Sequence, residues 1–432
     1  MRTKIPPTDS NETSVHVTAS MVPRPMISSR LHTLEQPPVS TLIYEDNADS
    51  SNFLEADRVV FGKKSIGTHF VADVKETAIV YGENQLGKLD GKVTNGLVRH
   101  SELYKIIGVI DSTKAGMDAG EVLDGLKSDI SVFRDIEDAI KSLNQIPKKF
   151  IYGIAPLASF LPKEQREIIF TAMEKGMDII NGLPEFFTED DEFVQNARKH
   201  CVQIHDIRKP KQRKDLHIFQ GSIFGVNTPI VTVFGTDCAV GKRTSAVNLA
   251  VALRKRGLTT AFIATGQTGL LQGAKYGVAV DVLSSGFQTG EVEHEIMRAL
   301  EAEQPDIIIV EGQGALSHPA FTSSTAIIRA ARPKAIIVQH PPKRKDRCDF
   351  PGIPMPTLES EIELIEVISG SKVIAITLNH EDMTDNEIDD TVMTYEKKYG
   401  LPTVDVLKHG CEKIVGVLLD EFPDLQKNMR TH

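Results

Sequence analysis

The sequence predicts an α/β protein built from two doubly wound parallel-sheet domains. Three observations lead to this prediction. The chain has 432 residues, and since domains usually hold about 100 to 200 residues, two domains are expected. From about residue 75, short apolar β-branched runs alternate with helical patterns, which is typical of a parallel sheet covered by helices. The second half also contains a glycine-rich loop between a strand-like run and a helix-like run.

Residues 1–50 are predicted to be a disordered tail. They are rich in Pro, Ser and Thr, as in "KIPPTDSNETS" and "EQPPVST", and such a segment buries too little apolar surface to offset the entropy of ordering. The tail lacks the apolar stretch of a signal peptide. A transit peptide stays open as an alternative, although the prolines argue against the amphipathic helix that it needs.

The first domain is predicted over residues 51–226 and is expected to be Rossmann-like. Its clearest helix is "LPKEQREIIFTAMEKG", which has Pro162 near its start, apolar residues on one face and Gly176 as its stop. The strands expected in this domain cover residues 77–82, 105–111, 130–133, 150–156, 177–182 and 202–208.

The second domain is predicted over residues 227–432. The basic segment 207–219, "IRKPKQRKDLHIF", suggests the crossing between the domains, although a solvated surface loop would have the same composition. The strands expected in the second domain alternate with helices and cover residues 229–234, 259–264, 307–310, 335–338, 372–377 and 403–406.

The loop "GTDCAVGKRT" makes the second domain P-loop NTPase-like. The run "PIVTVF" precedes the loop, and a helical pattern follows it and ends at Gly257. In this context the backbone N–H groups of the loop and the N-terminus of the helix face an anion, to which Lys242 adds a mobile positive charge. The residues predicted to hold phosphates are Gly235, Thr236, Asp237, Cys238, Ala239, Val240, Gly241, Lys242, Arg243 and Thr244.

Arg243 stands where a nucleotide-hydrolysing P-loop has the Ser or Thr that holds magnesium. An arginine cannot bind a cation, and Thr244 comes one position later, about 100° further round the helix. Either Thr244 takes the role through a shifted geometry, or the loop binds phosphates without metal and Arg243 supplies part of the counter-charge. A third interpretation is that Arg243 points away from the loop toward an acidic neighbour. We predict no bound metal.

Composition excludes several classes of partner. The net charge of −10 and pI of about 5.8 provide no basic surface for DNA or RNA, and no apolar run approaches the roughly 18 residues that cross a bilayer. The four cysteines are far apart and form no C-x-x-C pair, which indicates neither a zinc site nor a disulfide framework. We expect a cytoplasmic protein with small-molecule substrates, and a homo-oligomer, since two-sheet enzymes of this size often form dimers.

Polar residues at the carboxyl ends of strands in the second domain are the candidates for chemistry, because doubly wound sheets bind ligands at that edge. Glu311, which ends "PDIIIVE", is the first candidate for a catalytic base or a metal ligand, although it could also cap the glycine turn that follows. Gln267 and Thr268 in "ATGQTGLL" could bind substrate or turn the chain.

His340 ends a further strand and is the second catalytic candidate. The basic run after it, "KRKDR", contains Arg344, which could bind a carboxylate or phosphate of the substrate. A solvated surface run is the alternative for these charges. His318 in "LSHPAF" is a similar candidate.

These motifs resemble two known groups of proteins. The G-x5-G-K loop and "VEGQG" are similar to the dethiobiotin-synthetase-like P-loop proteins, in which the acid at that strand end helps to hold magnesium. Six segments over about residues 75–425 resemble, in the right order, a two-domain family long known only as a domain of unknown function. These segments are "KVTNGLVRHS", "IIGVIDSTKAGMDAG", "YGIAPLASFLPKEQREII", "GMDIINGLPEFF", "IHDIRKP" and "VFGTDCAVGKRTSAVNLA".

The characterised members of that family are D-glutamate N-acetyltransferases. The resemblance therefore implies an enzyme that moves an acetyl group from acetyl-CoA, its co-substrate, to the amine of an acidic D-amino acid, with D-glutamate as the expected acceptor. It also gives Arg243 a purpose, because the phosphates of coenzyme A must be held and left intact. Two alternatives stay open: a Mg-ATP-dependent synthetase resembling dethiobiotin synthetase, and a non-catalytic sensor that binds a nucleotide or CoA.

Overall fold

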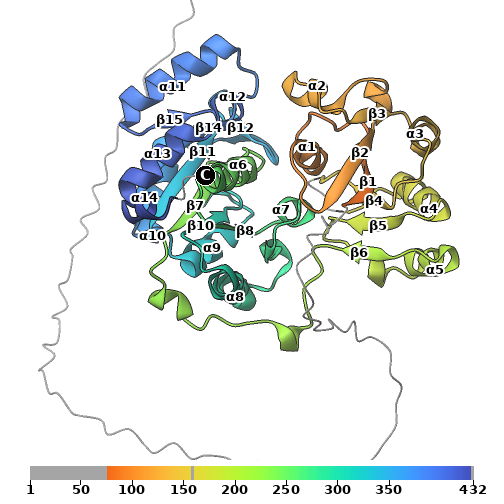
Figure 1. Cartoon of the computed structure of the whole chain (residues 1–432), viewed down its shortest axis with the longest axis horizontal. Helices are drawn as coiled ribbons and strands as arrows, with labels where there is room; N and C mark the ends of the chain where they lie inside the picture. Colours follow the sequence, from red (N-terminus) through yellow and green to blue (C-terminus); the bar gives the residue numbers. More distant parts are fainter. Residues whose placement is uncertain (1–74, 157–159, 430–432) are drawn as a thin grey trace, which may run out of the picture. The chain divides into compact units, whose positions relative to one another are not determined.

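The computed structural model describes residues 75–156 and 160–429. The tail predicted over residues 1–50 lies outside the described residues. Two parallel sheets covered by helices and one two-stranded antiparallel sheet make up the described part (Figure 1). Within these ranges, no helix combines the length and apolar character that crossing a membrane requires.

The first sheet has six parallel strands in the order β3-β2-β1-β4-β5-β6. The order reverses beside β1, which confirms the Rossmann-like prediction. The strands are β1 (Glu76–Tyr81), β2 (Tyr104–Ile110), β3 (Ser131–Phe133), β4 (Lys149–Tyr152), β5 (Asp178–Asn181) and β6 (Ile204–Asp206), and the helices are α1 (Lys92–Arg99), α2 (Ala119–Asp124), α3 (Ile136–Leu143), α4 (Arg166–Glu174) and α5 (Asp191–His200).

The second sheet has seven parallel strands in the order β15-β14-β11-β7-β10-β8-β9. Its strands are β7 (Ile230–Gly235), β8 (Thr260–Ala264), β9 (Tyr276–Gly277), β10 (Ile307–Glu311), β11 (Ala335–His340), β14 (Val373–Leu378) and β15 (Thr403–Val404), and β12 (Asp346–Arg347) pairs with β13 (Phe350–Pro354) in the small antiparallel sheet. The helices are α6 (Lys242–Lys255), α7 (Gln267–Leu271), α8 (Ser285–Glu303), α9 (Ser323–Ala331), α10 (Leu358–Ser369), α11 (Asp385–Tyr399), α12 (Val406–His409), α13 (Glu412–Glu421) and α14 (Asp424–Asn428).

Strand β7 shows why the second sheet is buried on both faces. Its residues point alternately to opposite sides. Ile230 and Phe234 pack in a core with α8, α9 and α10, whereas Val231 and Val233 pack in another core with α6, α13 and α14 (Figure 1). Both faces of the strand therefore need apolar side chains, which explains the continuous run "PIVTVF" and confirms the doubly wound fold.

The short helix α7 belongs to the second half of the chain but packs in the core of the first sheet. Leu271 at its end is fully buried in a cluster with Val80, Leu97 and Ile151. Helix α7 also contacts α1, where a Cβ atom on Gly96 would lie only 2.9 Å from Cγ2 of Thr268. The two halves of the chain thus share one apolar core at α7.

Two buried carboxylates on α8 hold the segment between β6 and β7, in which the basic run 207–219 lies. Glu291 accepts a hydrogen bond from the backbone N–H of His217 (2.6 Å). Glu293 accepts from the N–H groups of Gln220 (2.7 Å) and Ile223 (3.1 Å). These acids supply partners for backbone groups that no sheet or helix satisfies.

A substitution at Gly290 would test how closely the connecting segment approaches α8. A Cβ atom there would lie 2.6 Å from the backbone nitrogen of Phe219 and still closer to two other backbone atoms of residues 217 and 218. Gly290→Ala is expected to lower the free energy of unfolding by about 1–3 kcal/mol in urea titrations. Gly286, in the same helix, has no atom within 4 Å of its Cβ position, so Gly286→Ala should be neutral or stabilising by up to about 1 kcal/mol. Equal effects of the two changes would contradict the packing described.

Candidate functional site at the P-loop

The predicted phosphate loop connects the end of β7 to the start of α6. Ala239 and Gly241 have φ angles of +48° and +104°, so the chain turns sharply just before the helix. Gly241 is the N-cap residue and contributes no side-chain hydrogen bond to the first turn of α6. The N–H groups of that turn have no partner within the helix and point toward the loop. This arrangement is suited to binding an anion.

Two cations hold the carbonyl groups of the loop. The ammonium of Lys242 donates to the backbone oxygen of Asp237 (2.6 Å). Arg344 donates to the backbone oxygens of Cys238 (2.8 Å) and Ala239 (3.2 Å). Lys242 is buried, and this burial lowers its pKa. Because these carbonyls are occupied, the loop can present its N–H groups to a ligand.

The side chain of Asp237 lies behind the loop and is fully buried. Its Oδ2 accepts hydrogen bonds from Nη1 of Arg344 (3.1 Å) and from the backbone N–H of Cys348 (2.8 Å). Its Oδ1 lies 3.6 Å from Nη1 of Arg347 and 3.7 Å from Nε2 of His318. One carboxylate therefore joins the loop to two segments that lie some 80 and 110 residues further along the chain.

The atoms of Asp237, Cys238 and His318 that could bind a metal lie within 4.8 Å of one another. Nδ1 of His318, however, accepts the backbone N–H groups of Ala320 (3.2 Å) and Phe321 (3.3 Å). Nε2 must then carry the ring proton and cannot bind a metal. The guanidinium groups beside Asp237 would also repel a cation, so this cluster does not fit a metal site.

Glu311 ends β10, the strand beside β7, and is level with Val233. Its Oε2 accepts the backbone N–H of Thr265 (3.0 Å), and a Cβ atom on Gly269 would lie 2.9 Å from the same oxygen. Burial raises the pKa of Glu311 to about 7, against the opposing effects of the Thr265 hydrogen bond and the charge of Arg243. A carboxylate that is half ionised near neutral pH is suited to accept a proton.

His340 ends β11, on the other side of β7, and its ring lies behind the loop. Its Nδ1 shares a hydrogen bond with the hydroxyl of Thr236 (2.9 Å). Burial lowers the pKa of His340 to about 4, so the ring is neutral at pH 7 and a weak base. These contacts give His340 a role in fixing Thr236, and its catalytic role stays a prediction.

Arg243 points toward α1 and α7. Its Nη1 donates to the side-chain oxygen of Gln272, and its Nη2 to the hydroxyl of Thr244 (3.2 Å). The amide of Gln272 in turn donates to the backbone oxygens of Gly96 (2.7 Å) and His100 (2.8 Å) at the end of α1. The hydrogen-bond partners of Arg243 are thus neutral, and burial lowers its pKa to about 10. The carboxyl of Glu311 lies near enough to raise the pKa of Arg243 against this effect of burial, although no hydrogen bond joins the two side chains.

The residues predicted to bind substrate lie in different surroundings. Gln267 and Thr268 face the first half of the chain, since Cγ of Gln267 is 3.8 Å from the Cβ position of Gly182. Arg344 holds the loop, and its remaining nitrogen atoms form an ion pair with Glu381 (2.6 Å). The loop, Glu311 and Arg344 are therefore grouped around β7, while Gln267 and Thr268 lie toward α1 and β5.

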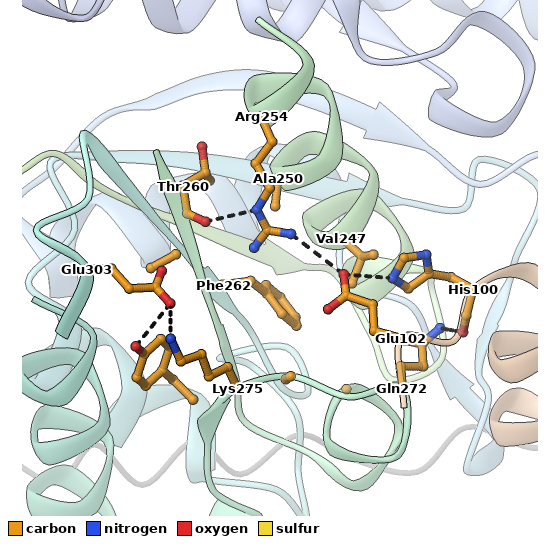
Figure 2. A pocket seen from close by; sticks show the side chains of 14 residues that line it. His100, Glu102, Val247, Ala250, Arg254, Thr260, Phe262, Gln272, Lys275 and Glu303 are labelled. Carbon is orange, nitrogen blue, oxygen red and sulfur yellow. Dashed lines mark hydrogen bonds and ion pairs between the residues drawn. The ribbon is translucent and has the colours of Figure 1, made fainter. Parts of the chain in front are cut away.

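Two cavities lie near these residues. The first, of about 240 Å³, has Phe262 and Tyr276 among its apolar lining residues and a rim of paired charges, such as Arg254 with Glu102 (Figure 2). None of residues 235–244 lines it. The second, of about 290 Å³, is lined by Arg243 and Thr244 together with Arg99, Lys127 and Asp124, among others. Its charged residues favour an anionic ligand next to the start of α6.

Sequence reasoning missed three partners in this site. Gln272 and Cys348 had no recognisable motif, and Arg347 was one of several basic residues in a run that could equally have been solvated. The strand-end rule identifies none of them, because Gln272 follows a short helix, Arg347 belongs to a two-residue strand outside the large sheets, and Cys348 lies in the turn after that strand.

Comparisons with known proteins agree with this architecture. A family model described as a domain of unknown function, DUF1611_N, Rossmann-like domain, matches residues 112–210, and the DUF1611_C P-loop domain matches residues 217–415. A D-glutamate N-acetyltransferase from Pseudoalteromonas sp. is 31% identical over 279 residues, which cover 63% of this chain and 81% of that protein. Another from Tritonibacter scottomollicae is 26% identical over 277 residues, with the same coverage of 63% and 81%.

A solved structure is also similar. The crystal structure of a DUF1611 family protein from Anabaena variabilis superposes with a TM-score of 0.73 at 26% identity. The match covers 80% of this chain and all of the other. The arrangement of both sheets is therefore shared with that protein.

Asp237→Asn is expected to destabilise the protein strongly. The change would leave the buried guanidinium groups of Arg344 and Arg347, whose side chains are 6% and 5% exposed, without their shared negative charge. We expect a loss of about 3 kcal/mol in the free energy of unfolding, measured in urea. The exposed pair of Asp424 and Lys427 provides the control, and Asp424→Asn should have no measurable effect. A loss from Asp237→Asn as small as that of the control would contradict the role assigned to Asp237.

Glu311→Gln should raise stability at alkaline pH and leave it unchanged in acid. The unfolded chain ionises this carboxyl near its ordinary pKa of 4.5, whereas the folded protein does so near 7. Stability is therefore lost as pH rises from about 4.5 to about 7, by about 3 kcal/mol in total. The neutral amide avoids this loss, so the Tm of the variant should exceed that of the wild type at pH 8 and equal it near pH 4.5. A constant difference in Tm across this range would contradict the raised pKa.

Proposed function

Because the chain belongs to the DUF1611 family, we propose that it is an N-acetyltransferase that moves the acetyl group of acetyl-CoA to the amine of an acidic D-amino acid, with D-glutamate as the first candidate. The names of the two curated relatives support this activity. The observation in this chain that carries the proposal is the buried carboxyl of Glu311. This carboxyl has a pKa of about 7 and ends the strand next to the loop that is suited to bind an anion.

In this proposal the P-loop holds phosphates of coenzyme A without cleaving them. The N-terminus of α6 and Lys242 supply hydrogen-bond donors and positive charge. Arg243 occupies the position of the magnesium-binding hydroxyl, and its charge is balanced by no hydrogen-bonded carboxylate among the described residues. The adjacent cavity, with Arg99 and Lys127, could accept a further phosphate of the same ligand.

Glu311 is the proposed general base. The α-amine of an amino acid is mostly protonated at neutral pH and must lose a proton before it can attack the thioester. The ionised carboxylate of Glu311 would take this proton. The amine nitrogen then bonds to the acetyl carbon, the carbon–sulfur bond breaks, and coenzyme A leaves as a thiolate that takes up a proton. Backbone N–H groups of the glycine-rich loops are suited to stabilise the intermediate oxyanion.

The test is the release of free thiol from acetyl-CoA by the purified full-length chain. We expect release when D-glutamate is added, a much slower release with L-glutamate, and no effect of EDTA. Glu311→Gln should lower kcat by about 100-fold or more, with little change in the KM for acetyl-CoA, and should abolish the rise in rate through about pH 7.

Two other results would contradict the proposal and favour a different function. Formation of ADP from ATP in the presence of Mg²⁺ and a carboxylate would favour a synthetase resembling dethiobiotin synthetase. Tight binding of acetyl-CoA or a nucleotide without turnover of any acidic amino acid would favour a sensor.

A further inference from the structure

Two of the four cysteines meet at the phosphate loop, and the proposed acetyl transfer does not use them. Cys238 is part of the loop and Cys348 lies between β12 and β13. Both are partly exposed, so small reagents can reach them. Of the other two, Cys201 is exposed at the end of α5 and Cys411 is buried at the start of α13.

Backbone contacts hold the two thiols together. The N–H of Cys348 donates to the buried carboxylate of Asp237, the residue before Cys238 (2.8 Å). Sγ of Cys348 lies 3.5 Å from the backbone oxygen of Cys238, to which Arg344 also donates. The thiol of Cys348 donates to that backbone oxygen and lies beside the side chain of Cys238, whose pKa it lowers. The pair is therefore fixed by the same contacts that shape the loop.

The environment favours a thiolate on Cys238 and a protonated thiol on Cys348. Nε2 of His318, which carries the ring proton, has no hydrogen-bond partner among the described residues. A ring nitrogen of His318 lies within 4.8 Å of Sγ of Cys238. The neighbouring thiol of Cys348, the ring of His318 and the charge of Lys242 lower the pKa of Cys238 to about 6, while the neighbouring sulfur of Cys238 and burial raise the pKa of Cys348. Such a division is typical of an attacking thiolate with a resolving thiol beside it.

We propose that Cys238 is a site of reversible oxidation by hydrogen peroxide, and that Cys348 resolves it as an intramolecular disulfide. The thiolate of Cys238 attacks one peroxide oxygen, the O–O bond breaks, and the hydroxide released takes a proton to form water. The sulfur of Cys348 then attacks the sulfenic acid of Cys238, its thiol proton goes to the departing hydroxide, and a second water leaves. One peroxide is reduced and two thiols are oxidised.

The disulfide would alter the phosphate loop. A covalent bond from Cys238 to Cys348 removes the negative charge of the Cys238 thiolate and pulls the loop toward residue 348. Binding of anions at the N-terminus of α6 should weaken as a result. For acetyl-CoA this consequence rests on the proposed function, whereas formation of the disulfide does not.

The experiment treats the full-length chain with hydrogen peroxide and maps its peptides by mass spectrometry without reduction. We expect loss of two thiols per chain, a peptide pair linked through Cys238 and Cys348, and full recovery with dithiothreitol. Cys348→Ser should stop at a sulfenic acid on Cys238 that dimedone traps, and Cys238→Ser should form neither product. Cys201→Ser is the matched control and should behave as the wild type.

Binding is measured in parallel by titrating acetyl-CoA, and separately inorganic pyrophosphate, into reduced and oxidised protein. Oxidation should weaken the binding of both ligands by at least about tenfold in the wild type. Cys348→Ser cannot form the disulfide, so its affinity should not show this loss. Oxidation of Cys201 ahead of Cys238, or linkage of other cysteines, would overturn the proposal. If the disulfide forms and reduced protein binds pyrophosphate but not acetyl-CoA, the oxidation site stands and the proposed acetyl transfer fails.

Discussion

The conformation of the phosphate loop depends on one buried carboxylate, that of Asp237. A charge out of contact with water must be paired and hydrogen-bonded, and here its partners come from segments far away in sequence: Arg344, Arg347 and Cys348 after β11, and His318 after β10. Arg344 also donates to the carbonyls of Cys238 and Ala239 and forms an ion pair with Glu381. The loop is thus held from behind by side chains, which leaves its inner surface to the backbone N–H groups.

Arg243 shows how one substitution changes what such a loop can do. At the position of a magnesium-binding hydroxyl, the guanidinium reaches Gln272, which holds the end of α1 in the first half of the chain. A guanidinium at this place carries a fixed positive charge and cannot ligate a divalent cation itself. The helix that begins at the phosphate loop is therefore linked, through Gln272, to the end of α1 in the first half of the chain.

Local patterns predicted the strands well, because fully buried parallel strands need continuous apolar β-branched runs such as those of β7 and β10. The strands β9, β12 and β13 were missed. β9 and β12 have only two residues each, and β13 contains two prolines and a glycine, so neither alternation nor an apolar run marks them. Glu311 could be located because the ends of parallel strands meet at one edge. The contacts of Cys348 and Gln272 could not be predicted from the sequence, because they depend on how loops and helix ends fold back onto the sheets.

The burial of Leu271 means that the two halves of this chain are not interchangeable modules. Its side chain fills a space among Val80, Leu97 and Ile151 that the first sheet cannot fill by itself. A gene fragment ending before β7 would encode a sheet with an open apolar hole, and a fragment starting there would expose a leucine to water. Recombination that joins either half to the corresponding half of another protein therefore has to preserve the packing of Leu271 in this space. This requirement restricts how such two-domain chains can diversify.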